Sequence, residues 1–150
     1  GYDISNISGT AAVGVMVVFS ARGGSAFGGE GFQPNKSEYR KFKIKTVFGP
    51  DDTGMMREIL TRRFGNPWRR PDLILIDGGV GQVNAAESVL KDLNIKISIV
   101  GIAKGPERKR NDFIRQIPKG VDEKVLIRVR DEAHRFAISY HKQVRSREFL

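Results

Sequence analysis

The stretch that decides the fold is Arg70-Pro-Asp-Leu-Ile-Leu-Ile-Asp-Gly-Gly-Val-Gly-Gln82. Its apolar run, Leu73 to Ile76, has no polar alternation, which is typical of a strand covered on both faces inside an α/β sheet. The run ends in Asp77, where α/β sheets bind ligands, and the glycines that follow allow a tight turn and a close approach. The alternative is that Asp77 only caps the next helix, and this short pattern does not decide between the two.

Three strands are predicted before this stretch, with the first two forming an antiparallel hairpin. They span Tyr2 to Ser8, Ala11 to Ser20, and Ser37 to Val47. In the third strand, Phe42 and Ile44 alternate with lysines, which predicts one apolar and one cationic face. The glycine-rich segment from Arg22 to Asn35 predicts a loop. Its two phenylalanines either stack on bases or pack against the body, and we favour packing.

Helices and further strands are predicted on both sides of the central stretch. Helices are expected from the Asp51-Asp52-Thr53 start to Phe64, from Gln82 to Leu93, and from Asp122 to Arg147; strands are expected from Lys96 to Ala103 and, shorter, from Phe113 to Pro118. The last helix has an apolar stripe, and its flank contains Arg130, His134, His141 and Arg145. The order β-β-β-α-β-α-β predicts an α/β fold with a mixed sheet, helices on its faces and a long carboxyl-terminal helix.

The composition limits the classes of function. The 150 residues fit one domain, and the amino-terminal Gly1 suggests a fragment of a longer protein. The absence of cysteine excludes thiolate catalysis and thiolate zinc sites, and no apolar run is long enough to span a membrane, so a cytoplasmic location is the default expectation. The net charge of +9 favours a polyanionic partner, with nucleic acid ahead of a membrane surface, although a solvated basic surface remains an alternative.

Acidic residues lie at the ends of several predicted elements. Asp3 is in the first strand, Asp51 and Asp52 begin the first helix, and Asp77 ends the central strand. If these strands are neighbours, the carboxylates share one cleft, where they repel one another unless a cation holds them. Such oxygen-rich sites suit Mg²⁺ or Mn²⁺, which can activate water for phosphodiester cleavage.

Several blocks of the sequence carry a resemblance to a known family. They are Asp3-Ile-Ser, Lys36-Ser-Glu-Tyr-Arg-Lys-Phe42, Met55-Met-Arg-Glu58, Leu60-Thr-Arg-Arg63, Pro71-Asp-Leu-Ile-Leu-Ile-Asp-Gly-Gly79, Val100-Gly-Ile-Ala-Lys-Gly105 and Ile127-Arg-Val-Arg-Asp-Glu-Ala-His-Arg-Phe-Ala137. In this order they resemble the carboxyl-terminal nuclease half of excinuclease UvrC, over nearly the whole chain. The resemblance implies an RNase H-like fold and a divalent-metal DNA endonuclease that makes the 5′ incision beside a lesion. It also implies UvrB and damaged duplex DNA as partners.

The resemblance also implies roles for single residues. Asp3 and Asp77 match the two strand aspartates of the family and would be metal ligands, and His134 would be a further ligand or a proton-transfer group. The Asp51-Asp52 pair matches another acidic position of the family, and we favour Asp52 as the residue that faces the site. Basic residues near the site are the candidate DNA contacts: Lys104, Arg108, Lys109, Arg130 and Arg135.

The sequence departs from the family pattern at three places. Val80 stands where the family usually has Lys, Asn6 stands where it often has His, and the Arg22–Asn35 segment is longer than usual. If the missing lysine holds phosphate or orients water, the site is weaker or uses another cation such as Lys104. The departures leave a second hypothesis open, a non-catalytic nucleic-acid-binding module on the same fold.

A third hypothesis is a metabolic enzyme that cradles phosphate in Asp77-Gly-Gly-Val-Gly81. That loop lacks the lysine and hydroxyl of a Walker motif, so the signal is weak. The arginines at positions 62, 63, 69 and 70 form another basic cluster, which we interpret as a solvated face, with phosphate contact as the second option.

Overall fold

The fold is seen in a computed structural model that describes residues 1–5, 12–21, 31–47, 49–104 and 111–148. A six-stranded sheet runs through its centre in the order β5-β2-β1-β6-β7-β8. The strands are β1 (Tyr2–Ser5), β2 (Val13–Met16), β5 (Arg40–Lys43), β6 (Leu73–Asp77), β7 (Ser98–Lys104) and β8 (Asn111–Ile114). β1, β6 and β7 are parallel neighbours, whereas β2, β5 and β8 each pair antiparallel with the strand they join. The predicted mixed sheet is therefore confirmed.

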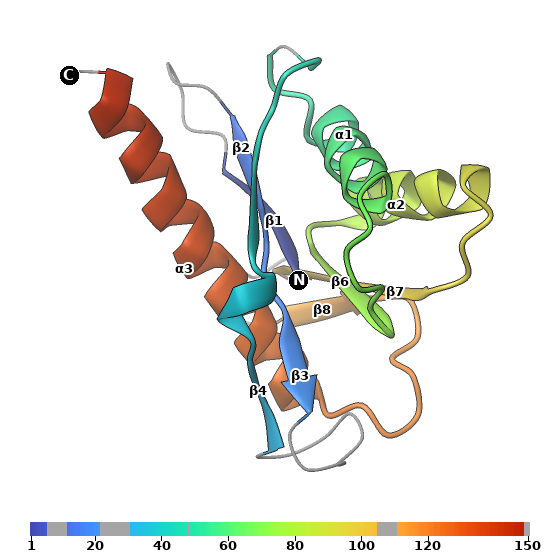
Figure 1. Cartoon of the computed structure of the whole chain (residues 1–150). Helices are drawn as coiled ribbons and strands as arrows, with labels where there is room; N and C mark the ends of the chain where they lie inside the picture. Colours follow the sequence, from blue (N-terminus) through green and yellow to red (C-terminus); the bar gives the residue numbers. More distant parts are fainter. Residues whose placement is uncertain (6–11, 22–30, 48, 105–110, 149–150) are drawn as a thin grey trace.

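Helices cover both faces of this sheet (Figure 1). α1 (Asp52–Phe64) and α2 (Val80–Asp92) pack against each other on one face, and α3 (Glu123–Glu148) lies along β1, β2 and β6 on the other. Each face has its own buried apolar cluster, with Ile59, Ile76 and Val83 in one and Leu75, Val100 and Val129 in the other. β6 contributes to both clusters, which explains why its apolar run does not alternate.

The predicted second strand is wrong in its length. The chain forms β2 only to Met16, and Phe19–Ala21 is a separate strand, β3, which pairs with β4 (Phe32–Pro34) in a two-stranded sheet. Gly1 bonds to Val17 through both its nitrogen and its oxygen, and two residues later Phe19 is opposite Pro34 of β4. Part of the predicted loop is thus a strand, while Phe27 and the rest of 22–30 lie outside the described residues.

The predicted third strand is shorter than expected. A 3-10 turn at Lys36–Glu38 precedes β5, which ends at Lys43. The predicted alternation holds within it, since Phe42 is buried and Lys41 and Lys43 are exposed.

The long carboxyl-terminal helix is confirmed, with one correction on its flank. The apolar stripe is predicted to run from Val125 to Val144. Its members Val125, Leu126, Val129, Ala133 and Ala137 are buried as predicted, whereas Phe136 and Tyr140 are half-buried. His141, predicted on the helix flank, is only 1% exposed. His141 follows Ala137 by four residues and therefore lies on the same face. Among the described residues, no helix is long and apolar enough to cross a membrane.

Candidate active site

Asp77 is the last residue of β6, at the carboxyl end of the central parallel strands. The helix that follows begins with Gly79 as its N-cap residue, and no side chain makes a capping hydrogen bond there. Asp77 is therefore not the cap of α2. The nitrogen of Gly78 still bonds to the oxygen of Ile102 in β7, so the Asp77 carboxylate lies at the carboxyl edge of the sheet, where parallel sheets bind ligands.

Asp3 comes from the neighbouring strand. β1 lies beside β6 with Tyr2 opposite Ile76, so Asp3 is next to Asp77 across the sheet. Tyr2 points to the α1 face, where its hydroxyl accepts from Arg63, and because successive strand side chains alternate, Asp3 points to the α3 face. Its residue is only 6% exposed.

His134 completes the group from α3. Its Nδ1 lies 3.2 Å from Oδ2 of Asp3. The imidazole is 63% exposed, so it forms the solvent side of the site while the two aspartates form its floor. One ligand atom from each of Asp3, Asp77 and His134 lies within 4.8 Å of the others.

The pKa values of both carboxylates in this group are raised. Burial raises the pKa of Asp3 to about 7, the negative charge of Asp77 adds to the rise, and His134 opposes it. Burial also raises the pKa of Asp77, against the opposing charges of Arg130 and His134. Both shifts favour a bound proton or cation over two free negative charges.

The donor set fits a divalent metal ion. Two carboxylates and one imidazole from three separate elements converge, and carboxylate-rich groups of this kind suit Mg²⁺ or Mn²⁺. Asp3 and Asp77 would hold the ion directly. The exposed side of the site leaves room for water and a substrate oxygen as further ligands.

Comparison with known proteins identifies the family. The family model described as the UvrC RNase H endonuclease domain matches residues 1–138. The chain belongs to this family. The UvrABC system protein C of Streptococcus thermophilus strain CNRZ 1066 is 45% identical over 159 residues, covering 97% of this chain and 25% of that protein. The protein of the same name from Methanococcoides burtonii is 47% identical over 161 residues, covering 97% and 24%.

This UvrC-family chain spans about a quarter of the length of these curated relatives. Family membership confirms the RNase H-like fold that the sequence blocks implied. The six-stranded sheet with its parallel centre, and the pair of strand aspartates at adjacent positions, agree with that assignment.

The structure does not bring the Asp51-Asp52 pair into the group. Asp51 is the N-cap residue of α1, and its side chain accepts from the backbone nitrogen of Gly54 at 2.9 Å. Asp52 is exposed in the first turn of that helix. Among the described residues, the converging ligand group is limited to Asp3, Asp77 and His134, so a role for Asp52 in this UvrC-family site remains a prediction.

Asp131 is an acidic residue near the site that sequence reasoning missed. Its negative charge raises the pKa of Asp77, and it pairs with Arg130 at 2.8 Å while remaining 65% exposed. The spacing could have indicated this position, because Asp131 precedes His134 by three residues and the two share a helix face.

The predicted DNA contacts lie partly outside the described residues. Arg108 and Lys109 are not described, and Lys104 is placed only as the last residue of β7. Arg130 lies close enough to Asp77 to lower its pKa. Arg135 is 57% exposed and donates to both oxygens of Glu132, at 2.6 and 3.0 Å.

Two further residues singled out in the sequence, Arg63 and Val80, are not part of the ligand group. The prediction that Arg63 lies on a solvated face is wrong, since it is 2% exposed and packs between α1 and β1. Val80, where the family resemblance led us to expect lysine, is the first residue of α2 and is 51% exposed.

Proposed function

We propose that this chain is the metal-dependent nuclease domain of a nucleotide excision repair protein and makes the 5′ incision beside a lesion in duplex DNA. The observation that carries the proposal is the convergence of Asp3, Asp77 and His134 from β1, β6 and α3. The names of the relatives, which place them in the UvrABC system, supply the repair context and support UvrB and damaged duplex DNA as partners.

A bound Mg²⁺ or Mn²⁺ would supply Lewis-acid stabilisation of the scissile phosphate and lower the pKa of an attacking water. Asp3 and Asp77 would hold this ion. Asp3 is buried and Asp77 is half-buried, which limits the access of competing water to the floor of the site. Because the group is open on the His134 side, a phosphodiester backbone would approach from there.

His134 is suited to move a proton or to act as a third ligand. When Nδ1 carries the proton, it donates to Asp3, which fixes the ring and leaves Nε2 free to accept a proton from water. When Nδ1 is the ligand atom, the same contact places it beside the carboxylates. Asp3 orients the imidazole by a hydrogen bond in the first case, and the shared ion would orient it in the second.

The cations around the group would hold the DNA backbone. Arg130 sits beside Asp77 and Asp131, and Arg135 extends from the exposed side of α3. Together with Lys104 and the basic segment that includes Arg108 and Lys109, these residues would bind phosphates without reading sequence. We propose Asp52, exposed at the start of α1, as a further catalytic carboxylate, the role that the family resemblance implies.

The decisive experiment changes one ligand. Asp77→Asn should reduce cleavage of a lesion-containing duplex in Mg²⁺ or Mn²⁺ by at least about a hundredfold, since even residues that only support ligands cost 10–100-fold. Isothermal titration should show loss of metal binding by the same variant. Asp92→Asn, the same change at the exposed far end of α2, should leave both unchanged.

If Asp77→Asn cleaved the duplex as fast as the unchanged chain, the assignment of this site would be wrong. Salt-sensitive DNA binding by the unchanged chain without cleavage in any divalent ion would instead favour the non-catalytic binding module.

A further inference from the structure

A groove lies between the outer side of α3 and the two-stranded sheet of β3 and β4. Its volume is about 440 Å³, and its lining includes the basic residues Lys36, Arg128 and Arg135, the acidic residues Asp131 and Glu132, and the ring of Phe19. We call it the α3–β4 groove. The three metal ligands are not part of its lining, so it is a separate feature of the surface.

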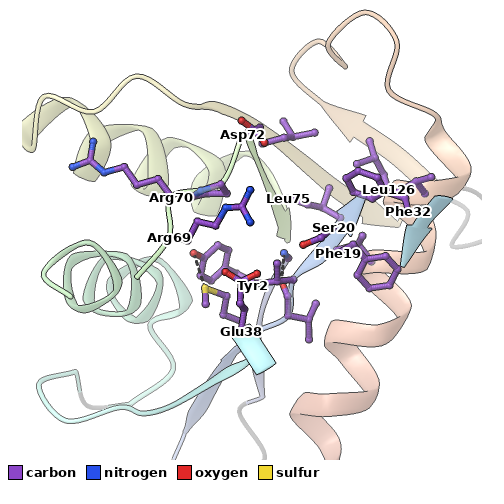
Figure 2. Close-up of a pocket in the computed structure, with 18 of the residues that line it drawn as sticks. Tyr2, Phe19, Ser20, Phe32, Glu38, Arg69, Arg70, Asp72, Leu75 and Leu126 are labelled. Carbon is purple, nitrogen blue, oxygen red and sulfur yellow. Dashed lines mark hydrogen bonds between the residues drawn. The ribbon is translucent and has the colours of Figure 1, made fainter. Parts of the chain in front are cut away.

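Apolar contacts hold the two-stranded sheet against α3. Phe19 of β3 and Phe32 of β4 pack against the buried cluster that contains Leu126 of α3. Figure 2, a close-up of the cavity at the beginnings of β1 and β6, shows these three side chains grouped on one side of that cavity. Because side chains packed in this way leave little freedom to the elements that carry them, the groove between sheet and helix is a preformed part of the fold.

Arg128 is oriented in the groove by contacts other than an ion pair. Its guanidinium lies over the Phe19 ring, 5.4 Å from the centroid, and its Nη1 donates to the oxygen of Phe32 at 3.2 Å. Within the described part of the chain, Arg128 makes no salt bridge. A stacked guanidinium loses little further freedom when an anion binds, and it still has N–H groups to donate.

Lys36 faces the groove from the other wall, in the turn that follows β4. Hydrogen bonds fix this turn, since the Asn35 side chain donates to Glu38 at 2.8 Å and accepts from Ser37 at 2.7 Å. The Asn35 backbone nitrogen also bonds to the oxygen of Val18 at 2.7 Å. The lysine is exposed, so a fixed backbone presents a cation opposite the oriented guanidinium.

The two acidic residues of the groove already have cationic partners. Glu132 accepts from Arg135 at 2.6 and 3.0 Å, and Asp131 pairs with Arg130 at 2.8 Å. The two cations on the walls of the groove therefore add a positive charge that these pairs do not cancel. Such a charge favours an anionic ligand.

The groove begins beside the metal site. Burial raises the pKa of Asp77, and the charge of Asp131, which lines the groove, adds to the rise, so Asp131 lies between the two sites. His134 and Arg128 are six positions apart on α3, which corresponds to about 9 Å of rise and about a third of a turn, or roughly 10–13 Å across the helix surface. A DNA strand rises about 3.4 Å per nucleotide, so this separation corresponds to about three or four phosphates.

We propose that the α3–β4 groove binds the DNA strand that is cut, about three or four phosphates from the cleaved bond, with Arg128 and Lys36 as the phosphate contacts. The proposal rests on the proposed nuclease function, which brings the strand to His134. An acidic peptide would satisfy the same charges, but the continuity with the metal site favours nucleic acid. Contacts of this kind position a strand without reading its sequence.

The first test measures DNA binding without cleavage. In a chelator, Lys36→Gln and Arg128→Gln should each reduce the slope of log affinity against log salt for a lesion-containing duplex by about 1, since each phosphate contact contributes about 0.9. Arg128→Lys keeps the charge and should retain most of the slope. Lys91→Gln, at an exposed lysine of α2 on the other face of the sheet, is the matched control and should change nothing.

Unchanged slopes for both groove variants would overturn the groove as a DNA site. The same conclusion would follow if a polyglutamate peptide displaced the duplex from the unchanged chain at an equal concentration of charge. Because this test needs no cleavage, it decides about the groove even if the proposed nuclease function fails.

The second test locates the contact along the strand. A series of duplexes, each with one neutral methylphosphonate linkage at a successive position around the cleaved bond, is cut in Mg²⁺. For the unchanged chain, a neutral linkage about three or four phosphates from the bond should slow cleavage at limiting enzyme severalfold. In the double variant Lys36→Gln/Arg128→Gln the same linkage should have no further effect, because the contact is already lost. Fully additive effects, or an effect only in the complementary strand, would contradict the proposed path.

Discussion

Asp3 combines burial, a like-charged neighbour and an imidazole within hydrogen-bonding distance. Two carboxylates in such proximity do not stabilise the fold by themselves, because each disfavours the ionised form of the other. Their arrangement therefore favours the proposed metal ion over a role in packing.

The raised pKa of Asp3 makes the stability of the metal-free protein depend on pH. The folded pKa of Asp3, about 7, lies above its ordinary value of 3.8, so the folded state binds the proton more tightly than the unfolded state. The resulting stabilisation is complete below about pH 4 and is lost as the pH rises through 7. In a chelator, the melting temperature should fall by several degrees between pH 5 and pH 8, as measured by circular dichroism.

Two controls connect this trend to the site. Mg²⁺ should restore the melting temperature at pH 8 and have little effect at pH 5, where protons compete with the ion. Asp3→Asn should flatten the decline. A slope that persists in Asp3→Asn would have to come from other groups.

Val80 offers a second test at the level of one residue. It is 51% exposed at the first turn of α2, so a longer side chain can be added there without a clash. Val80→Lys would place a cation beside the Asp77 loop and should raise DNA affinity or cleavage several-fold at low salt. Val80→Gln, which has similar length and no charge, is the control, and equal gains from both would exclude an electrostatic role.

At the scale of elements, the first turn of α1 separates a structural aspartate from a candidate functional one. Asp51 caps the helix through Gly54, and loss of such a cap costs about 1 kcal/mol. Asp51→Ala should therefore lower the melting temperature by roughly 2–4 °C for a chain of this size.

Asp52→Ala is the matched variant one residue along. Because Asp52 makes no capping bond, its loss should change the melting temperature less. A drop in cleavage without a drop in stability would assign Asp52 the functional role that the family resemblance implies. Equal destabilisation by both variants would contradict the capping assignment.

The elements also show what the sequence could predict. The strands β6 and β7 could be predicted because burial on both faces leaves a continuous apolar run, and α3 because burial on one face leaves a helical period. The ends of β2 and β3 were not, because Phe19 belongs to a different sheet only through its partner at Pro34. Partner choice is a tertiary property with no local signature.

The same distinction holds within the site. The sequence indicated Asp77 as a site residue, because it follows a buried strand and precedes glycines. His134 and His141 have similar sequence surroundings in one helix and differ only in what α3 packs against at each position. His134 meets Asp3 at the edge of the sheet, and His141 is buried. In the sequence, Arg63 cannot be distinguished from the neighbouring surface arginines, because its burial depends on the contact with Tyr2 of β1.

At the scale of the whole molecule, the net charge of +9 predicts a strongly salt-dependent affinity for DNA. Each phosphate contact contributes a slope of about −0.9 in a plot of log affinity against log salt for duplex DNA. Arg135→Ala, on the α3 face, should therefore reduce the slope by about 1, as measured by fluorescence anisotropy.

Arg115→Ala is the control for this measurement. Arg115, like Arg135, is exposed and donates to a glutamate, but its partners Glu87 and Asn84 belong to α2, on the other face of the sheet. Its loss should leave the slope unchanged. The opposite result, with Arg115 altering the slope and Arg135 not, would place the DNA on the α2 side.

The contact between Asp3 and His134 joins residues 131 positions apart. A ribosome that has released β1 and β6 has produced both acidic ligands, yet the histidine arrives only with the final helix. A nascent or truncated polypeptide therefore holds the aspartates without the imidazole. If the proposed function holds, the order of synthesis keeps the metal site incomplete until α3 has docked.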